Sequence, residues 1–224
     1  MDTIIVFDVD GVLVEVSESY RQSIVETVAH FTGKRIGLDS IQDYKNQGGW
    51  NNDWALSQKI ASDLGVAVPF DQVVQKFNEL FLGKNGDGLI LREHWIPDSA
   101  LLKRLGQTRD LAIFTGRDRY ELDLTLRRFA PAICFAPIIC TEDVERGKPA
   151  PDGLIAIQSA RPDARLWFVG DTVDDARSAR AAGVPFVGIA AGMENRRDDL
   201  LSLFRKEDAV AIIDNVNQIE TVIA

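Results

Sequence analysis

Residues 3–14 read Thr-Ile-Ile-Val-Phe-Asp-Val-Asp-Gly-Val-Leu-Val. An apolar, β-branched run ends directly in Asp8, with a second carboxylate at Asp10 and a glycine at Gly11. Such a run predicts a strand that is buried on both faces, and open α/β sheets bind ligands at the carboxyl ends of their strands. We therefore expect Asp8 and Asp10 to lie at a functional site, although an ordinary Asp-Gly turn explains the same residues.

Three later apolar runs also lead to polar residues. After 111–114 comes Thr115-Gly116-Arg117, after 138–140 comes Gly147-Lys148-Pro149, and after 166–169 comes Gly170-Asp171-Thr172-Val173-Asp174-Asp175. Each alone fits a helix cap or a solvated loop. Together with the run that ends in Asp8, the chain has four such runs, and this favours a shared site at one edge of the predicted sheet.

The periodicity predicts an α/β protein with a helical insertion. Between 15 and 94 the apolar residues follow helical spacing without a convincing strand, whereas 95–224 alternates strands with helices. We predict a core domain of residues 1–14 and 95–224, with a parallel sheet covered by helices on both faces, and an all-helical inserted domain of residues 15–94. The insertion is expected to hold helices near 20–31, 52–64 and 70–82. The core is expected to hold helices near 98–106, 118–129, 152–160, 174–182, 195–204 and 215–222, and further strands near 111–115, 137–140, 166–170, 186–190 and 209–213.

The composition indicates a soluble globular chain. Its formal charge of −9 over 224 residues argues against a surface for nucleic acid or for an anionic membrane. No apolar run approaches the roughly 18 residues of a membrane span, and no secretory leader is evident, so a cytoplasmic location is the expectation. Cys134 and Cys140 lack metal-site spacing and are predicted to be buried thiols. The oligomeric state is not readable from the sequence.

The acids predict phosphoryl-transfer chemistry. A carboxylate at a central strand end can attack phosphorus, so Asp8 is the predicted nucleophile, and Asp10 is the predicted proton donor and acceptor. Two crowded carboxylates need a cation nearby, and the all-oxygen donor set suits Mg²⁺. The predicted metal-site residues are Asp8, Asp10, Asp171 and Asp175, with Asp174 as the alternative to Asp175.

The other strand-end groups suit a phosphate. Thr115 and the amide of Gly116 offer neutral donors, and Lys148 offers a positive charge that offsets the charge of Asp8. We count Thr115 and Lys148 as catalytic, and Gly116 and Arg117 as substrate-binding. In the insertion, the glycine-flanked residues Trp50, Asn51 and Asn52 are predicted to contact the substrate, although they also fit a helix cap and a local core.

The four motifs resemble those of the haloacid dehalogenase superfamily. They are Asp8-Val9-Asp10-Gly11-Val12-Leu13-Val14, Phe114-Thr115-Gly116-Arg117, Gly147-Lys148-Pro149-Ala150-Pro151-Asp152 and Val169-Gly170-Asp171-Thr172-Val173-Asp174-Asp175. The resemblance implies a Rossmann-like core, a helical C1 cap and Mg²⁺-dependent phosphoryl transfer. Members that cleave carbon–halogen bonds generally lack the second aspartate, so Asp10 favours a phosphatase. The segment 44–54 is similar to a branch whose label refers to imidazoleglycerol-phosphate metabolism.

The expected activity is hydrolysis of a small phosphorylated metabolite through an aspartyl-phosphate. A phosphomutase would use the same residues and pass the phosphoryl group to a second substrate hydroxyl. A non-catalytic protein that binds a phosphorylated metabolite is the alternative from another class, and the complete set of Asp8, Asp10, Lys148 and Asp171 argues against it.

Overall fold

The computed structural model describes residues 2–84, 86–191 and 197–223. The chain divides into two compact units, Met1–Val14 with Trp95–Ala224, called here the core unit, and Glu15–His94, called the helical unit. The chain passes between the units within two short strands, β2 (Val14–Glu15) and β3 (His94–Trp95), which pair with each other.

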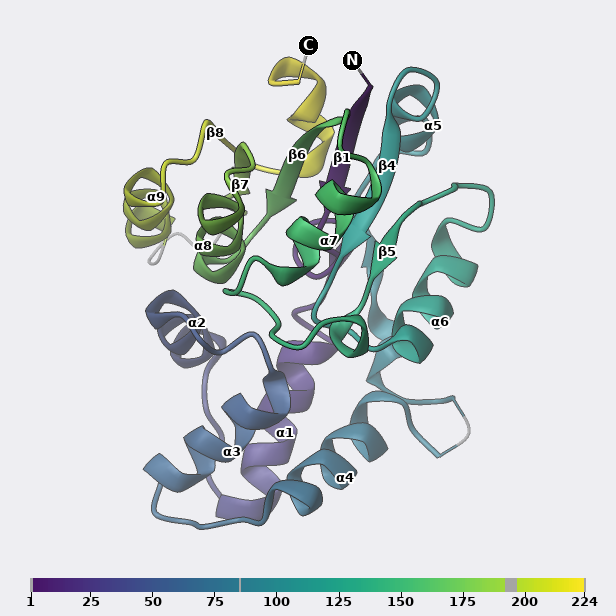
Figure 1. Cartoon of the computed structure of the whole chain (residues 1–224). Coiled ribbons are helices and arrows are strands. Elements are labelled where there is room, and N and C mark those ends of the chain that lie inside the picture. The colour runs from purple at the N-terminus through teal and green to yellow at the C-terminus, as the bar shows by residue number, and fades with distance from the viewer. Residues whose placement is uncertain (1, 85, 192–196, 224) are drawn as a thin grey trace. The chain divides into compact units, whose positions relative to one another are not determined.

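The core unit is built on a six-stranded sheet in the order β5-β4-β1-β6-β7-β8 (Figure 1). Its strands are β1 (Thr3–Phe7), β4 (Asp110–Phe114), β5 (Ile138–Ile139), β6 (Arg165–Gly170), β7 (Phe186–Ile189) and β8 (Ala211–Ile213). All five neighbouring pairs are parallel. The predicted parallel α/β core is confirmed.

Strand β1 lies at the point where the strand order reverses. From β1 the chain first adds β4 and β5 on one side, and then returns to add β6, β7 and β8 on the other side. The loops that follow β1 and β6 therefore leave the sheet in opposite directions. Such a switch point opens a crevice at the carboxyl ends of the strands, which is where ligands bind in sheets of this kind.

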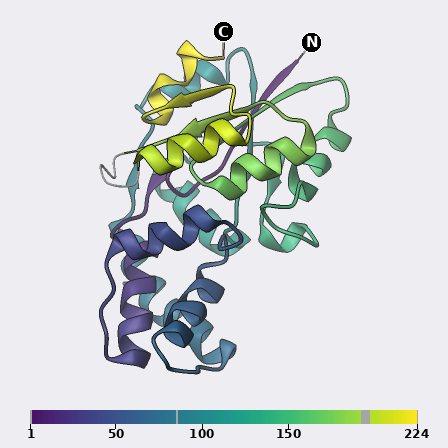
Figure 2. The ribbon, with the colours of Figure 1, turned by 90° about the vertical axis from the view of Figure 1, so that its left-hand side faces the viewer.

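Helices bury the sheet because its strands are apolar on both faces. Ile4 and Val6 of β1 face a core that includes side chains of α7 (Asp152–Ala160), α8 (Val173–Ala182) and α9 (Arg197–Lys206). Figure 1 shows α7 and α8 in front of the sheet, and Figure 2 shows α9 beside α8. Ile5 and Phe7, which point to the other face, are also fully buried. The remaining core helices are α5 (Leu101–Leu105) and α6 (Arg119–Phe129), and the 3₁₀ helices are η2 (Thr141–Asp143) and η3 (Val216–Thr221).

The helical unit packs four helices around apolar stripes. They are α1 (Tyr20–Thr32), α2 (Leu38–Gln47), α3 (Asp53–Asp63) and α4 (Phe70–Phe81), followed by the 3₁₀ helix η1 (Leu89–Arg92). Tyr20 of α1 packs on Phe77 and Phe81 of α4, with ring centroids 5.9 and 4.1 Å apart. Among the described residues, no helix is both long enough and apolar enough to cross a bilayer.

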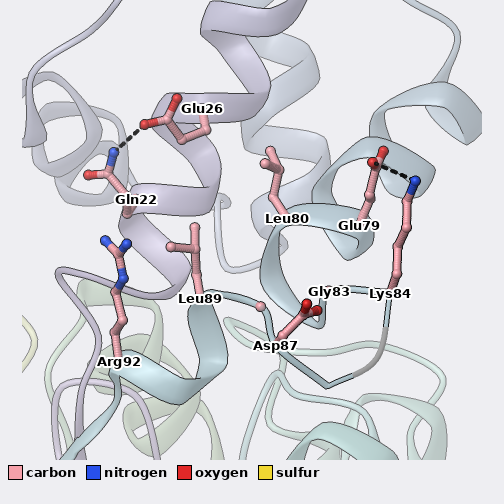
Figure 3. Close-up of a pocket in the computed structure, with 10 residues that line it drawn as sticks. Gln22, Glu26, Glu79, Leu80, Gly83, Lys84, Asp87, Leu89 and Arg92 are labelled. Atoms are coloured by element: carbon pink, nitrogen blue, oxygen red, sulfur yellow. Dashed lines mark hydrogen bonds and ion pairs between the residues drawn. The ribbon is translucent and has the colours of Figure 1, made fainter.

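A cavity of about 520 Å³ lies within the helical unit between α1, α4 and η1 (Figure 3). Its lining mixes apolar and polar side chains and carries both signs of charge, with Glu26 and Glu79 on the acidic side and Lys84 and Arg92 on the basic side. Glu79 lies 3.9 Å from the ammonium of Lys84, so part of this charge is already paired.

The structure corrects several expectations about secondary structure and about the two cysteines. Helix α2 was not predicted, because only Ile41 and Gln42 of it are buried and the apolar stripe is too narrow to show in the sequence. The helix expected at 215–222 is instead the 3₁₀ helix η3. Its two buried residues, Val216 and Ile219, are three residues apart, which is one turn of a 3₁₀ helix. The expected start of a helix at 195 lies outside the described residues.

The insertion does contribute strand residues, Glu15 and His94, at its two ends. The prediction for the cysteines is half wrong. Cys140 is buried, and burial raises the pKa of its thiol to about 12. Cys134 is exposed, and it precedes the strand of this region, β5.

Candidate active site

Three carboxylates meet at the carboxyl ends of β1 and β6. Asp8 directly follows β1, Asp171 directly follows β6, and the Asp8 amide donates to the carbonyl of Val169 at 2.9 Å. One oxygen from each of Asp8, Asp171 and Asp175 lies within 4.8 Å of the others. The parallel pairing of β1 and β6 thus brings together acids that are more than 160 residues apart in the chain.

Two glycines allow the acids to approach the backbone this closely. Gly11 has a φ of +72°, and a Cβ there would lie 2.0 Å from Asp171 Oδ2. At Gly170 a Cβ would lie 2.4 Å from the Cβ of Asp175. Any larger residue at either position would displace a carboxylate, so both glycines are part of the geometry of the acidic cluster.

Lys148 lies between two of the acids. Its Nζ is 2.8 Å from Asp8 Oδ1 and 2.6 Å from Asp175 Oδ1, and all three side chains are almost fully buried. Phe114 and Phe168 flank the ammonium, with ring centroids 5.5 and 5.8 Å away. The loop after β5 therefore places its lysine at the acidic cluster, as the sequence predicts.

The acids outnumber the lysine, and the pKa of Asp8 shows the effect. Burial raises the pKa of the Asp8 carboxyl well above its usual range; Lys148 opposes this, while the charges of Asp175 and Asp171 add to it. Burial alone would lower the pKa of Lys148, but Asp175 and Asp8 outweigh burial and raise it. The protein alone thus leaves a surplus of negative charge beside Asp8.

The residues fit a divalent cation. The donor set consists of carboxylate oxygens, which Mg²⁺ prefers. Asp175 uses Oδ2 to accept from the Thr172 hydroxyl at 2.6 Å and the Thr172 amide at 2.9 Å. Its other oxygen, Oδ1, is buried and has the ion pair with Lys148 but no hydrogen bond of regular geometry to a described residue. The acidic cluster includes Asp175 and not Asp174, whose carboxylate lies 3.8 Å from Arg177.

Thr115 is placed at the end of β4, beside β1. Its hydroxyl accepts a bond from the Arg117 amide at 3.2 Å, which leaves the O–H itself as a donor. Thr115 is buried, whereas Gly116 is exposed and offers its amide. This placement allows both groups to serve as neutral donors to a phosphate oxygen.

Asp10 and Arg117 form a separate ion pair. Asp10 lies outside the cluster of Asp8, Asp171 and Asp175, and its Oδ1 is 2.5 Å from an Arg117 nitrogen. Arg117 is 2% exposed, so its guanidinium does not face an open substrate site. Asp10 as a metal ligand and Arg117 as a substrate ligand are therefore not supported by the side-chain geometry.

The predicted substrate residues of the insertion lie in the helical unit. Asn52 caps α3 by accepting the Ala55 amide at 2.9 Å, as the simpler interpretation expects. Trp50 is half-buried and meets Tyr44 edge-on at 6.2 Å between ring centroids. Asn51 is also half-buried. None of the three lines the cavity of Figure 3.

The sequence reasoning missed Thr125, a buried residue of α6 whose hydroxyl accepts from Arg117 at 2.6 Å. A signal for it was available. Asp118 accepts the Glu121 amide and so begins α6, and from this start Glu121 and Thr125 fall one turn apart on one face of the helix.

Residues 5–189 match the model of the haloacid dehalogenase-like hydrolases. An imidazoleglycerol-phosphate dehydratase of Phytophthora nicotianae is 34% identical over 194 residues, which are 83% of this chain and 42% of that protein. A phosphoglycolate phosphatase of Escherichia coli K12 is 38% identical over 131 residues, which are 56% of this chain and 51% of that protein. The chain thus spans about half the length of these two relatives.

Solved structures show the same fold. A hydrolase from Pseudomonas syringae superposes with a TM-score of 0.72 at 16% identity, covering 99% of this chain and 98% of that one. At this identity the likeness concerns the fold alone. The family match, in contrast, extends over most of the chain and includes Asp8, Thr115, Lys148 and Asp171. The chain belongs to the haloacid dehalogenase-like hydrolase family.

Proposed function

We propose that the protein is a Mg²⁺-dependent phosphatase that hydrolyses a small phosphorylated metabolite through a phosphorylated Asp8. The observation that carries the proposal is the position of Asp8, which is buried at the switch point of the sheet, between Lys148 and two further carboxylates. Burying a carboxylate beside other carboxylates costs folding free energy, so a purely structural role does not explain Asp8 well. The same position suits a nucleophile that acts beside a bound cation.

The residues divide the work as follows. Asp8 attacks phosphorus, and the bond to the leaving oxygen breaks as that oxygen takes a proton from Asp10. Asp10 then accepts a proton from the water that cleaves the phosphorylated Asp8. Thr115 and the Gly116 amide donate to the phosphoryl oxygens, and Lys148 offsets negative charge on Asp8. Asp8, Asp171 and Asp175 would hold Mg²⁺, which when bound supplies the positive charge that keeps Asp8 ionised and screens the phosphate.

Phosphatase names among the relatives support the reaction class. The E. coli relative named above is a phosphoglycolate phosphatase, and it matches 56% of the chain. The dehydratase name belongs to a protein of which more than half lies outside the match, so it supplies no activity for this chain. The proposed substrate class is therefore a small phosphate monoester. Membership of this family is also compatible with a phosphomutase. Release of inorganic phosphate distinguishes a phosphatase from a mutase.

The test is a screen of phosphorylated sugars, acids, nucleotides and amino-acid intermediates with Mg²⁺, in which inorganic phosphate is measured against substrate consumed. We expect stoichiometric phosphate release that stops in excess chelator and returns with Mg²⁺ but hardly with Ca²⁺, which accepts looser geometry. Asp8→Asn should abolish turnover while the circular dichroism spectrum stays unchanged. Full activity in chelator would refute the metal site, and product isomers without phosphate release would indicate a mutase.

A further inference from the structure

The guanidinium of Arg117 is the immediate partner of Asp10. Its Nη2 lies 2.5 Å from Asp10 Oδ1, and its Nε lies 3.1 Å from Oδ1 and 3.3 Å from Oδ2. The Arg117 side chain is fully buried, while the Asp10 side chain is 31% exposed. One side of the Asp10 carboxylate is therefore fixed by the protein, and the other side is open.

Arg117 is itself held from several directions. Its Nη1 donates to the Thr125 hydroxyl of α6 at 2.6 Å. Its amide donates to Thr115 Oγ1 at 3.2 Å, and its carbonyl accepts the Thr141 amide at 3.1 Å. A guanidinium has a planar, rigid fork of donors, so these contacts fix its orientation. The position of Asp10 is thus determined by α6 and by the end of β4, which are remote from Asp10 in the sequence.

The two oxygens of Asp10 are not equivalent. Oδ1 has two short contacts with Arg117, whereas Oδ2 has one contact at 3.3 Å. The oxygen with the weaker contact is the one that can carry a proton to a leaving group and take it back from water. A proton donor contributes only when it is within hydrogen-bond reach of the reacting oxygen, so fixing Oδ1 also fixes the direction in which Oδ2 acts.

We propose that Arg117 is a positioning residue, which, held by Thr125, orients Asp10 so that Oδ2 transfers the proton in the phosphatase reaction. The proposal rests on the proposed function. In the first step the Oδ2 proton passes to the leaving oxygen as the bond between that oxygen and phosphorus breaks. In the second step Oδ2 takes a proton from the water that attacks phosphorus on Asp8, which restores the starting state of both aspartates.

The test uses leaving groups that differ in their need for a proton. A nitrophenyl phosphate has a stable anion as its leaving group, whereas an alkyl phosphate such as glycerol phosphate needs protonation as its bond breaks. We expect Arg117→Lys to lower the rate of alcohol release in the first turnover by about 10- to 100-fold for the alkyl ester, in the range of a misplaced general acid, and at least tenfold less for the aryl ester. The cleavage of phosphorylated Asp8 by water is the same step for both esters and should slow equally. KM should change little for either ester.

Three further variants separate positioning from folding. Arg119→Lys, two residues further on, changes a partly exposed arginine that pairs with Asp143, and should leave the rates on both esters unchanged. Thr125→Val removes the hydroxyl that orients Arg117, while Thr125→Ser keeps it, so only the valine variant should show the loss on the alkyl ester. In an Asp10→Asn background, Arg117→Lys should add little further loss, because both changes then act on the same proton transfer.

The outcomes are distinct. Equal losses in the first-turnover rate on both esters, or a loss that adds fully to that of Asp10→Asn, would overturn the positioning role of Arg117, because a structural role affects every leaving group alike. Higher activity on the alkyl ester would overturn it as well, since Arg117 would then restrain Asp10. A wild-type protein without turnover on any phosphate ester would refute the proposed function, and the proposal for Arg117 with it.

Discussion

At the scale of single residues, Asp8 carries a conflict between stability and chemistry. Burial and the neighbouring carboxylates raise the pKa of Asp8 in the folded chain above its value in the unfolded chain. A raised pKa favours folding only where the acid is protonated. This contribution is fully present below about pH 4, the usual pKa of an aspartate, and is lost as the pH rises through the pKa of the folded state.

Asp8→Asn should therefore stabilise the metal-free protein at pH 7, because the amide carries no charge to be buried. We expect a Tm in chelator several degrees above that of the wild type, where 1 kcal/mol corresponds to about 2–4 °C in a chain of this size. The difference should vanish below about pH 4 and shrink when Mg²⁺ is added. Asp163→Asn, which changes an exposed acid, serves as the control. A lower Tm for Asp8→Asn in chelator would show that the buried charge of Asp8 does not destabilise the metal-free protein.

At the scale of elements, the turn after β1 is shaped for the acid of β6. Gly11 has a positive φ, and its missing side chain leaves the space that Asp171 fills. Gly33, which ends α1, has a similar φ of +68°, but a Cβ there would meet nothing within 4 Å. Substitutions at the two glycines can therefore distinguish the effect of backbone strain from the effect of displacing Asp171.

Gly33→Ala should cost about 1–2 kcal/mol of unfolding free energy, the strain of an alanine in the left-handed region, and should leave Mg²⁺ binding intact. Gly11→Ala should show this strain and also weaken Mg²⁺ binding at least tenfold, because the methyl group displaces Asp171. Chemical denaturation and titration calorimetry measure the two effects. Equal Mg²⁺ affinity in both variants would show that the approach of Asp171 to the turn is unimportant.

At the scale of the whole molecule, the helical unit is the proposed source of substrate specificity, acting as a cap. The loop that ends α2 has positive φ at Gly48 and Gly49 and leads to the half-buried Trp50 and Asn51, which can offer an aromatic surface and an amide. The side-chain oxygen of Asn52 already accepts the Ala55 amide as the cap of α3. The prediction therefore applies to Trp50 and Asn51.

Trp50→Ala or Asn51→Ala should lower kcat/KM for the best metabolite of the screen by roughly 10- to 100-fold, the value of one or two lost contacts. The loss on p-nitrophenyl phosphate should be far smaller, because this ester presents little for a cap to contact. Leu91→Ala, an exposed position of the same unit outside this loop, is the control. A uniform loss on both substrates would assign Trp50 and Asn51 to the packing of the helical unit.

The sequence by itself determined the architecture of the core and the composition of the site. Strands with both faces apolar must lie inside a sheet covered on both sides, so the run 3–7 already indicated a buried central strand. Parallel strands end at one edge, so the acids after β1 and β6 and Lys148 after β5 could be predicted to converge. The periodicity was too weak for α2, since a helix with two buried residues leaves almost no apolar stripe.

Only the tertiary structure decided what each side chain meets. Arg117 was predicted to bind substrate because it follows Thr115-Gly116, yet its burial and its pairing with Asp10 depend on where α6 packs against the sheet. The choice between Asp174 and Asp175 depends on which of them faces Asp8 and Lys148, and the structure places Asp175 there. Such contacts join residues that are far apart in the chain, and local sequence patterns carry no information about distances of that kind.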